Sequence, residues 1–319
     1  MNEENKKENP KSELRLDLVS GDWVVVAVNR ARRPVNLMKT GCPFCEGEII
    51  KSAIFRHKKI ISVLNDFPSF SYGDDLNRRF DGPNQIMDGV GFHEIVVYPD
   101  HDKDLHQFSE EELKNMIDVF QMRYLDLIDK KFIKYVSIFH NHGKEAGASV
   151  FHPHSQIVAI PVIDPQLRDS LDGAESFYIK NKQCVYCTMI DWDIKDGQRV
   201  IYENKKFVVL CPFAPQANFE IRIYPKEHRP YFEKIEEKDK ILFAEALKVA
   251  LSKIYNGLNN PAYNFYIHTA PKGEEDYEHY HWHLVILPKT SIFAGFEYSA
   301  GMEVSTIEPE KAAEFLRKV

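Results

Sequence analysis

Cysteine and histidine are the residue types whose spacing in this sequence points most directly to chemistry. Four of the five cysteines form two CxxC pairs, Cys42 with Cys45 and Cys184 with Cys187, while Cys211 stands alone. Thiolates three positions apart can hold one metal ion from a tight turn, and zinc is a common ion for such pairs. A thioredoxin-like redox pair would need a βαβ context, whereas the segment TGCPFCEGEI is rich in turn-forming residues. The spacing therefore favours zinc binding over redox chemistry.

Each CxxC pair is followed by two histidines that could complete a tetrahedral site, and these histidines are 51 residues apart in both halves of the sequence. Four protein ligands define structural sites with no open position for a catalytic water. The predicted ligands are Cys42, Cys45, His101 and His152 in the first half, and Cys184, Cys187, His228 and His279 in the second. In the second half His268, His281 and His283 offer a competing set. We therefore expect two zinc ions per chain.

The segment GASVFHPHSQIVAIP contains the best candidate for a nucleophile. Alternate residues of a strand share one face, so His152, His154 and Gln156 point the same way. Zinc on His152 would fix this strand, and Pro153 restricts its backbone further. Imidazole has a reference pKa of about 6.5, is largely neutral at pH 7, and forms a phosphoimidazole that stays reactive. We predict His154 as a covalent nucleophile and Gln156 as a donor to the developing charge.

The loop before this strand is suited to phosphate. Gly143 and Gly147 allow close backbone approach, and Ser149 supplies a hydroxyl group. A lone histidine would more simply be structural, but a His-Pro-His-Ser-Gln run behind a glycine-rich loop is more specific. The equivalent loop of the second half, PKGEEDYEH, carries four acidic residues that would repel phosphate. We expect that copy to be structural or to face a sugar.

The elements that must position these residues also occur twice. The run Ser109-Glu110-Glu111-Glu112 is a capping box that opens an amphipathic helix, and a second helical pattern runs through Ala244, Leu247, Leu251 and Ile254. Strand-like runs surround each helix, ending in HPHSQIVAIP and HYHWHLVILP. This arrangement predicts an α+β fold of two equivalent domains with antiparallel sheets and helices packed on them. The predicted boundaries are a flexible tail over residues 1–14 and domains over 15–170 and 171–319.

Composition excludes several classes of protein. The 319 residues are 44% apolar and 28% charged, as in an ordinary globular protein. A net charge of −7 argues against a nucleic-acid binder. No apolar run approaches the roughly 20 residues needed to cross a bilayer, and MNEENKKENPKSE has no secretory apolar segment. We expect a cytoplasmic protein that binds neither membrane nor nucleic acid.

With these motifs the sequence resembles the galactose-1-phosphate uridylyltransferase family, which is histidine-triad-like, over nearly the whole chain after residue 14. The segment HNHGKEAGASVFHPHSQ is similar to the family's active-site signature. The resemblance implies that Asn141 and Ser149 lie near the phosphates, that His154 is the nucleophile and that Gln156 is its partner. It also implies the zinc ligand His101 within YPDH.

Other segments resemble parts of the family that contact the substrate. SGDWVVVAVNRARRP is similar to the opening strand and arginine pair that serve the nucleotide-sugar, LNDFP to the uridine-binding segment, and FAGFE to the hexose-contacting segment. The implied binding residues are Arg30, Arg33, Asn65, Asp66, Phe296 and Glu297. The family fold is a pair of half-barrels in a homodimer whose active sites borrow residues across the interface.

The resemblance implies a ping-pong enzyme that moves UMP from UDP-glucose to galactose 1-phosphate through a covalent nucleotidyl-His154 intermediate, with an N-terminal catalytic domain. Ser155 replaces a glycine of the best-known members, and Glu303 stands near the place of a sugar-contacting glutamine. HPHSQ together with two CxxC pairs also resembles a branch that acts on ADP-sugars with phosphate as acceptor. A hydrolase of the superfamily would carry a third histidine at Gln156, and a non-catalytic zinc module would not explain the His154 site.

Overall fold

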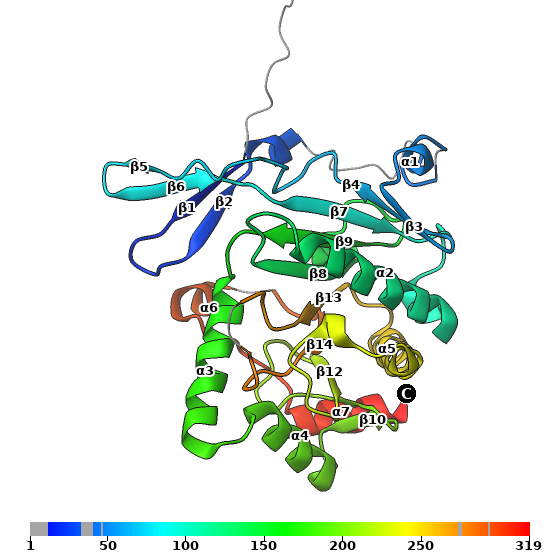
Figure 1. Ribbon diagram of the computed structural model, residues 1–319. Coiled ribbons are helices and arrows are strands. Elements are labelled where there is room, and N and C mark those ends of the chain that lie inside the picture. Colours follow the sequence, from blue (N-terminus) through cyan, green and yellow to red (C-terminus); the bar gives the residue numbers. More distant parts are fainter. Residues whose placement is uncertain (1–11, 33–40, 46, 274–275, 293) are drawn as a thin grey trace, which may run out of the picture.

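The computed structural model describes residues 12–32, 41–45, 47–273, 276–292 and 294–319 (Figure 1). The fold is α+β with antiparallel sheets, as predicted, and strands pair in one ten-stranded and one four-stranded sheet. Most of the predicted tail lies outside the described residues. Its last three residues are described and ordered into the fold, since Ser12 is 6% exposed, Glu13 begins strand β1 and Leu14 is only 1% exposed. No helix in the described ranges is long and apolar enough to span a membrane.

The ten-stranded sheet contains both sequence repeats. Its order is β10-β11-β12-β14-β13-β8-β9-β7-β4-β3, and the repeats meet where β13 pairs antiparallel with β8. The strands are β3 (Phe55–His57), β4 (Ile60–Leu64), β7 (Phe92–Val97), β8 (Tyr135–His142), β9 (His154–Ile160), β10 (Val200–Glu203), β11 (Phe207–Leu210), β12 (Ile221–Pro225), β13 (Tyr263–His268) and β14 (His283–Pro288). The two predicted domains therefore share one continuous sheet.

Two long helices cover one face of this sheet. The capping box predicted for α2 (Glu110–Ile128) is present, since the Ser109 hydroxyl accepts from the Glu112 N–H and the Glu112 carboxylate accepts from the Ser109 N–H. Its partner α5 (Glu237–Leu258) buries all four apolar residues that the sequence pattern assigned to its inner face. The two helices contact each other, and the main hydrophobic core lies between them and the sheet (Figure 1).

The remaining helices lie around the sheet. α3 (Pro165–Asn181) begins at an Asp164 cap and contains the predicted domain boundary at 170/171. Together with α4 it packs on the opposite side from α2, over Val208, Leu210 and Tyr224. The others are α1 (Gly47–Lys51), α4 (Val185–Asp196), α6 (Gly295–Ala300), α7 (Pro309–Lys318) and the 3-10 turns η1 (Val28–Arg32), η3 (Leu105–Gln107), η4 (Lys144–Ala146) and η5 (Phe232–Lys234).

A buried ion pair fastens α2 to the sheet. The Arg123 guanidinium donates to both carboxylate oxygens of Glu94, at 2.8 and 2.6 Å, and the Ser62 hydroxyl donates to the same carboxylate at 2.8 Å. Glu94 is 1% exposed, so its charge depends on this pairing. The contact links α2 to β4 and β7, and β7 pairs directly with the predicted nucleophile strand β9.

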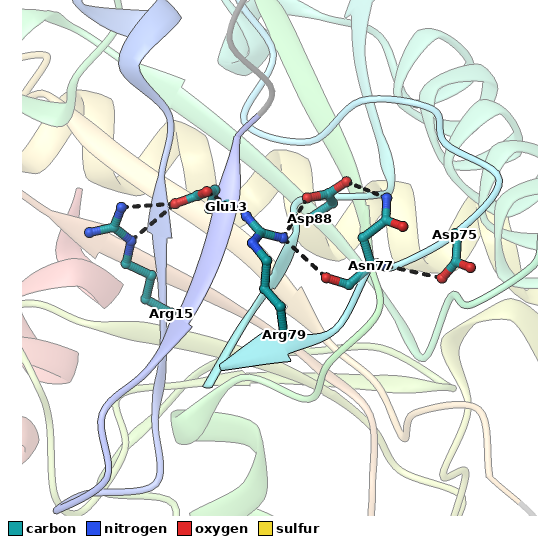
Figure 2. Close-up of polar contacts among 6 residues, drawn as sticks. All are labelled: Glu13, Arg15, Asp75, Asn77, Arg79 and Asp88. Carbon is teal, nitrogen blue, oxygen red and sulfur yellow. Dashed lines mark hydrogen bonds and ion pairs between the residues drawn. The ribbon is translucent and has the colours of Figure 1, made fainter. Parts of the chain in front are cut away.

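The four-stranded sheet carries a surface charge network (Figure 2). Its order is β2-β1-β6-β5, from β1 (Glu13–Leu16), β2 (Trp23–Val26), β5 (Arg79–Asp81) and β6 (Asn84–Asp88). Arg79 donates to Glu13 at 2.5 Å and to Asp88 at 2.9 Å, which ties β5 to β1 and β6. The Arg79 side chain is 41% exposed, and solvent-exposed pairs of this kind contribute little stability.

Candidate active site

His154 opens β9 and is held in one tautomer. Its Nδ1 lies 2.9 Å from the His152 carbonyl oxygen, which can only accept, so Nδ1 carries the proton. The lone pair therefore belongs to Nε2, the nitrogen that a nucleophile would use. The ring is 5% exposed and makes an edge contact with Phe44, with ring centroids 5.1 Å apart. The geometry presents an oriented imidazole next to the first CxxC turn.

Gln156 is oriented by a residue that sequence reasoning missed. The Ser69 N–H donates to His93 Nδ1 at 3.1 Å, so His93 Nε2 is protonated and donates to Gln156 Oε1 at 3.0 Å. This bond occupies the Gln156 oxygen and directs its amide donors away from His93. Asn65 Nδ2 also lies 3.1 Å from His93 Nε2. Two adjacent polar residues, His93 and Glu94, in the otherwise apolar run FHEIVVY were the available signal.

Ser155, where the best-known members carry glycine, points away from His154. Its hydroxyl lies 2.5 Å from the Tyr98 hydroxyl and 3.2 Å from His140 Nδ1. Burial, followed by the charges of His154 and His142, lowers the pKa of His140 well below its ordinary value. Ser155 thus completes a buried polar chain behind the nucleophile strand and has a supporting role.

The glycine-rich loop connects β8 to β9 through η4. Gly143 has φ 81°, and a Cβ there would lie 2.6 Å from the Ala262 Cβ, so only glycine fits. Gly147 also has positive φ, 85°. Asn264 Nδ2 donates to Asn141 Oδ1 and to the Ala146 carbonyl, both at 2.8 Å. A side chain of the second repeat therefore orients Asn141, which sequence reasoning did not anticipate.

A cavity of about 580 Å³ lies beside these residues. Its lining includes Arg30, His93, Asn141, Gln156 and Asn264 among apolar side chains. Arg30 Nη1 donates to the Phe67 carbonyl at 3.1 Å and to the Ser69 hydroxyl at 3.0 Å. An apolar cavity with a few convergent polar groups is typical of a small-molecule site.

The other predicted substrate residues are only partly gathered here. The Asn65 Oδ1 accepts from the Phe67 N–H at 2.8 Å, Asp66 is exposed beside it, and Ser149 is half-buried in the loop before β9. Arg33 lies outside the described residues. Among the described residues, Phe296 and Glu297 do not line this cavity; they lie on α6, where Glu297 accepts from the Ala294 N–H.

The first metal group has the ligands predicted from the sequence. Cys42, Cys45, His101 and His152 place four ligand atoms within 4.8 Å of one another. Cys45 Sγ lies 3.2 Å from His101 Nδ1 and 3.4 Å from His152 Nδ1. Tetrahedral zinc would separate a sulfur and a nitrogen ligand by about 3.6 Å. His152 Nε2 donates to the Tyr98 carbonyl, which leaves Nδ1 for the metal, and burial lowers the pKa of His152 toward the neutral form a ligand requires.

The second metal group corrects the prediction at one ligand. Cys184, Cys187 and His228 are joined by His281 rather than by His279. Cys187 Sγ lies 3.4 Å from His228 Nδ1 and 3.6 Å from His281 Nδ1, and His281 Nε2 donates to the Pro225 carbonyl at 2.9 Å. His281 therefore repeats the geometry of His152. Its neighbour two residues on, His283, begins β14 as His154 begins β9.

Fold and site together define a protein of two fused α+β repeats, each with a Cys₂His₂ group, of which the first contains an oriented imidazole, an amide donor and a glycine-rich loop. Comparison identifies the family. The N-terminal domain of galactose-1-phosphate uridyl transferase matches residues 2–163, and a domain of unknown function (DUF4921) matches residues 102–318. The chain belongs to the galactose-1-phosphate uridylyltransferase family.

Relatives of two activities are similar to this chain over almost their whole length. ADP-glucose phosphorylase of Arabidopsis thaliana is 31% identical, covering 98% of this chain and 94% of that protein. Galactose-1-phosphate uridylyltransferase of Thermotoga maritima is 30% identical, covering 96% and 98%. The crystal structure of an Arabidopsis thaliana ADP-glucose phosphorylase with bound ADP-glucose matches with a TM-score of 0.79 at 33% identity, covering 97% of this chain and 99% of that one.

Proposed function

We propose that this protein transfers a nucleotidyl group through His154, moving UMP from UDP-glucose to galactose 1-phosphate in two displacements. The observation that carries the proposal is the hydrogen bond from His154 Nδ1 to the His152 carbonyl, which leaves Nε2 as the nucleophilic nitrogen. The neighbouring Gln156, held by His93, supplies amide donors to the same place. Membership of the uridylyltransferase family supports this chemistry.

The reaction balances with the chain's own residues. In the first step His154 Nε2 attacks the α-phosphorus, the bond to the bridging oxygen breaks, and glucose 1-phosphate leaves with the electron pair. The ring then carries positive charge, which the His152 carbonyl stabilises at Nδ1–H. In the second step a phosphate oxygen of the acceptor attacks the same phosphorus and His154 leaves as neutral imidazole. Gln156 and Asn141 would donate to the non-bridging oxygens in both steps.

Zinc is the ion that the two Cys₂His₂ groups suit best, since thiolate and imidazole ligands in a compact four-ligand set are typical of structural zinc. Bound zinc would crosslink the CxxC turn to the start of β9. His152 is the ligand that connects this support to the nucleophile, because its carbonyl also holds His154. The residues that meet the substrate do not belong to the metal groups.

The substrate contacts proposed by resemblance extend the site. Asn65 and Asp66 would hold the nucleoside, Arg30 and Arg33 the nucleotide-sugar, and Ser149 and Gly147 the phosphates. Phe296 and Glu297 would meet the hexose in a homodimer, across the subunit interface.

The proposed hexose contact can be tested by substitution. Glu297→Ala should impair turnover with hexose 1-phosphate and leave formation of the nucleotidyl-enzyme unchanged. Equal loss in both half-reactions would show that Glu297 is structural.

A second candidate is an ADP-sugar phosphorylase, which would use the same histidine chemistry with phosphate as acceptor. The similarity to the Arabidopsis ADP-glucose phosphorylase, at 31% and 33% identity, favours it. A substrate panel decides between the two. The zinc-loaded enzyme is incubated with UDP-glucose or ADP-glucose, and product is followed with galactose 1-phosphate or phosphate as acceptor. Faster turnover of UDP-glucose with galactose 1-phosphate supports uridylyl transfer; faster phosphorolysis of ADP-glucose supports the second candidate.

A further inference from the structure

The second repeat reproduces the geometry of the first around its own Cys₂His₂ group. His283 Nδ1 donates to the His281 carbonyl at 3.1 Å, as His154 Nδ1 donates to the His152 carbonyl at 2.9 Å. The ring of Tyr186 lies 5.4 Å from that of His283, in the place where Phe44 contacts His154. The two repeats can therefore be superimposed residue by residue through their sheet registers.

The registers show which segment of the second repeat corresponds to the proposed nucleoside segment. In the first repeat Val96 of β7 pairs with Ser62 on one neighbouring strand and with Ser155 on the other. In the second repeat Ile223 of β12 pairs in the same way with Val209 and Leu284. Asp66 stands four residues after Ser62, and Phe213 stands four residues after Val209. Phe213 therefore occupies the position of Asp66, and α4, which begins within the second CxxC pair, occupies the position of α1.

A cavity of about 1410 Å³ lies at this equivalent position. α4, the segment after β11 and the inner end of β12 line it, together with Cys184, Cys187 and His228. Two of its lining aromatics are unusually exposed: Trp192 is 61% exposed and Phe213 is 74% exposed. The Arg199 guanidinium lies 5.2 Å from the centre of the Phe213 ring. Exposed aromatic faces beside cations are the usual means of stacking a nucleobase.

The lining of the cavity contains six cationic side chains against four carboxylates, Asp191, Asp193, Asp276 and Glu278, so positive charge is in excess although two of the carboxylates belong to the acidic PKGEEDYEH loop. Arg222 lines it with a side chain that is 19% exposed, and pairs with Glu220 at 2.6 Å. Three of these cations are lysines, Lys182, Lys195 and Lys234, and the Nζ of Lys234 lies 3.9 Å from the centre of the Tyr231 ring. These charges would stabilise an anionic group next to a stacked base.

The same cavity lacks the groups needed for transfer. The ring of Tyr224, which lines the cavity, lies against His283, the residue that corresponds to His154, with ring centroids 5.0 Å apart. Arg222 pairs with Val285 as Ile95 pairs with Gln156, so a valine stands where the amide donor would be. A ligand here would therefore lack the oxyanion donor that Gln156 provides in the first repeat.

We propose that this cavity is a second, non-catalytic binding site for a nucleoside 5′-phosphate, with the base stacked on Trp192 or Phe213 and the phosphates near Arg222. The choice of ligand rests on the proposed function of the first repeat, because the equivalent segment there is assigned to the nucleoside. The evidence for a binding cavity with aromatic and cationic side chains comes from the second repeat alone.

Equilibrium dialysis of the full-length, zinc-loaded protein with ADP and, separately, UDP tests this proposal. The wild-type protein should bind two nucleotides per chain with ADP, with UDP or with both. The nucleotide that reaches this ratio identifies the base that the second site accepts. Trp192→Ala and Phe213→Ala should weaken one of the two sites, by roughly 5- to 150-fold for loss of one stacking partner. Phe80→Ala is the matched control, since Phe80 is 71% exposed and lies outside both cavities.

The outcomes separate this site from the first one. His154→Ala should keep binding at the second site, whether or not the wild-type enzyme forms a nucleotidyl adduct. If no nucleotidyl adduct forms on the wild-type enzyme, the proposed function is contradicted, but the second binding site is not. One nucleotide per wild-type chain with both probes, or two sites that neither Trp192→Ala nor Phe213→Ala weakens, would overturn it.

Discussion

Exchanging His281 for alanine should remove one of two metal ions, whereas His279→Ala should remove none. His281 is fully buried with its Nδ1 3.6 Å from Cys187 Sγ, while His279 lies outside the ligand group. With free zinc a thousandfold above Kd, each bound ion stabilises the folded chain by about 4 kcal/mol. An unfolding entropy of about 2.1 cal/mol/K per residue gives roughly 0.7 kcal/mol/K for this chain of 319 residues, so losing one ion should lower Tm by about 6 °C.

Elemental analysis of the purified variants, followed by thermal unfolding in buffered zinc, measures both quantities. Wild type and His279→Ala should each contain two ions and unfold at the same temperature. His281→Ala should contain one ion and unfold earlier. The reasoning fails if His279→Ala loses an ion, or if His281→Ala keeps both.

Three further substitutions test the support of the active site. Gln156→Ala should reduce kcat by about 10²–10³, as loss of one oxyanion donor does, and steady-state kinetics would show a smaller effect if Gln156 were merely structural. Ser155→Gly should lower the unfolding free energy in urea by about 1–3 kcal/mol, because the Tyr98 hydroxyl loses its partner, yet leave kcat within a few-fold. Arg123→Met should lower the unfolding free energy by about 3–5 kcal/mol, because it leaves Glu94 buried without its partner. Arg79→Met, at an exposed pair, should lower it by less than about 1 kcal/mol. Similar losses for the two variants would contradict this account of burial.

Sequence periodicity predicted the elements that depend on local pattern. The capping box at Ser109 and the buried face of α5 follow from spacing alone, because a helix places every third or fourth side chain on one side. The ligands of the first metal group were also predicted correctly, although His154 stands only two residues after the ligand His152. In the second group the 51-residue spacing predicted the wrong histidine. His279, His281 and His283 stand at alternate positions, which an extended chain places on one face, and only the contact with Cys187 identifies His281 as the ligand.

Long-range contacts had no comparable signal in the sequence. The pairing of β8 with β13, which merges the repeats into one sheet, joins strand edges more than 100 residues apart. Asn264 orients Asn141 only because of that pairing. His93 reaches Gln156 because β7 and β9 are adjacent, and the sequence shows His93 only as one of two polar residues in a mainly apolar strand.

The most direct test of the account is the intact mass of the enzyme after mixing with a nucleotide-sugar in the absence of acceptor. Wild type should gain the mass of one uridylyl group from UDP-glucose, or one adenylyl group from ADP-glucose, and lose it when acceptor is added. His154→Ala should remain unmodified and inactive while keeping its metal, because His154 is not a ligand. Absence of any adduct on the wild-type enzyme with both donors, or transfer by His154→Ala, would contradict covalent catalysis at this histidine.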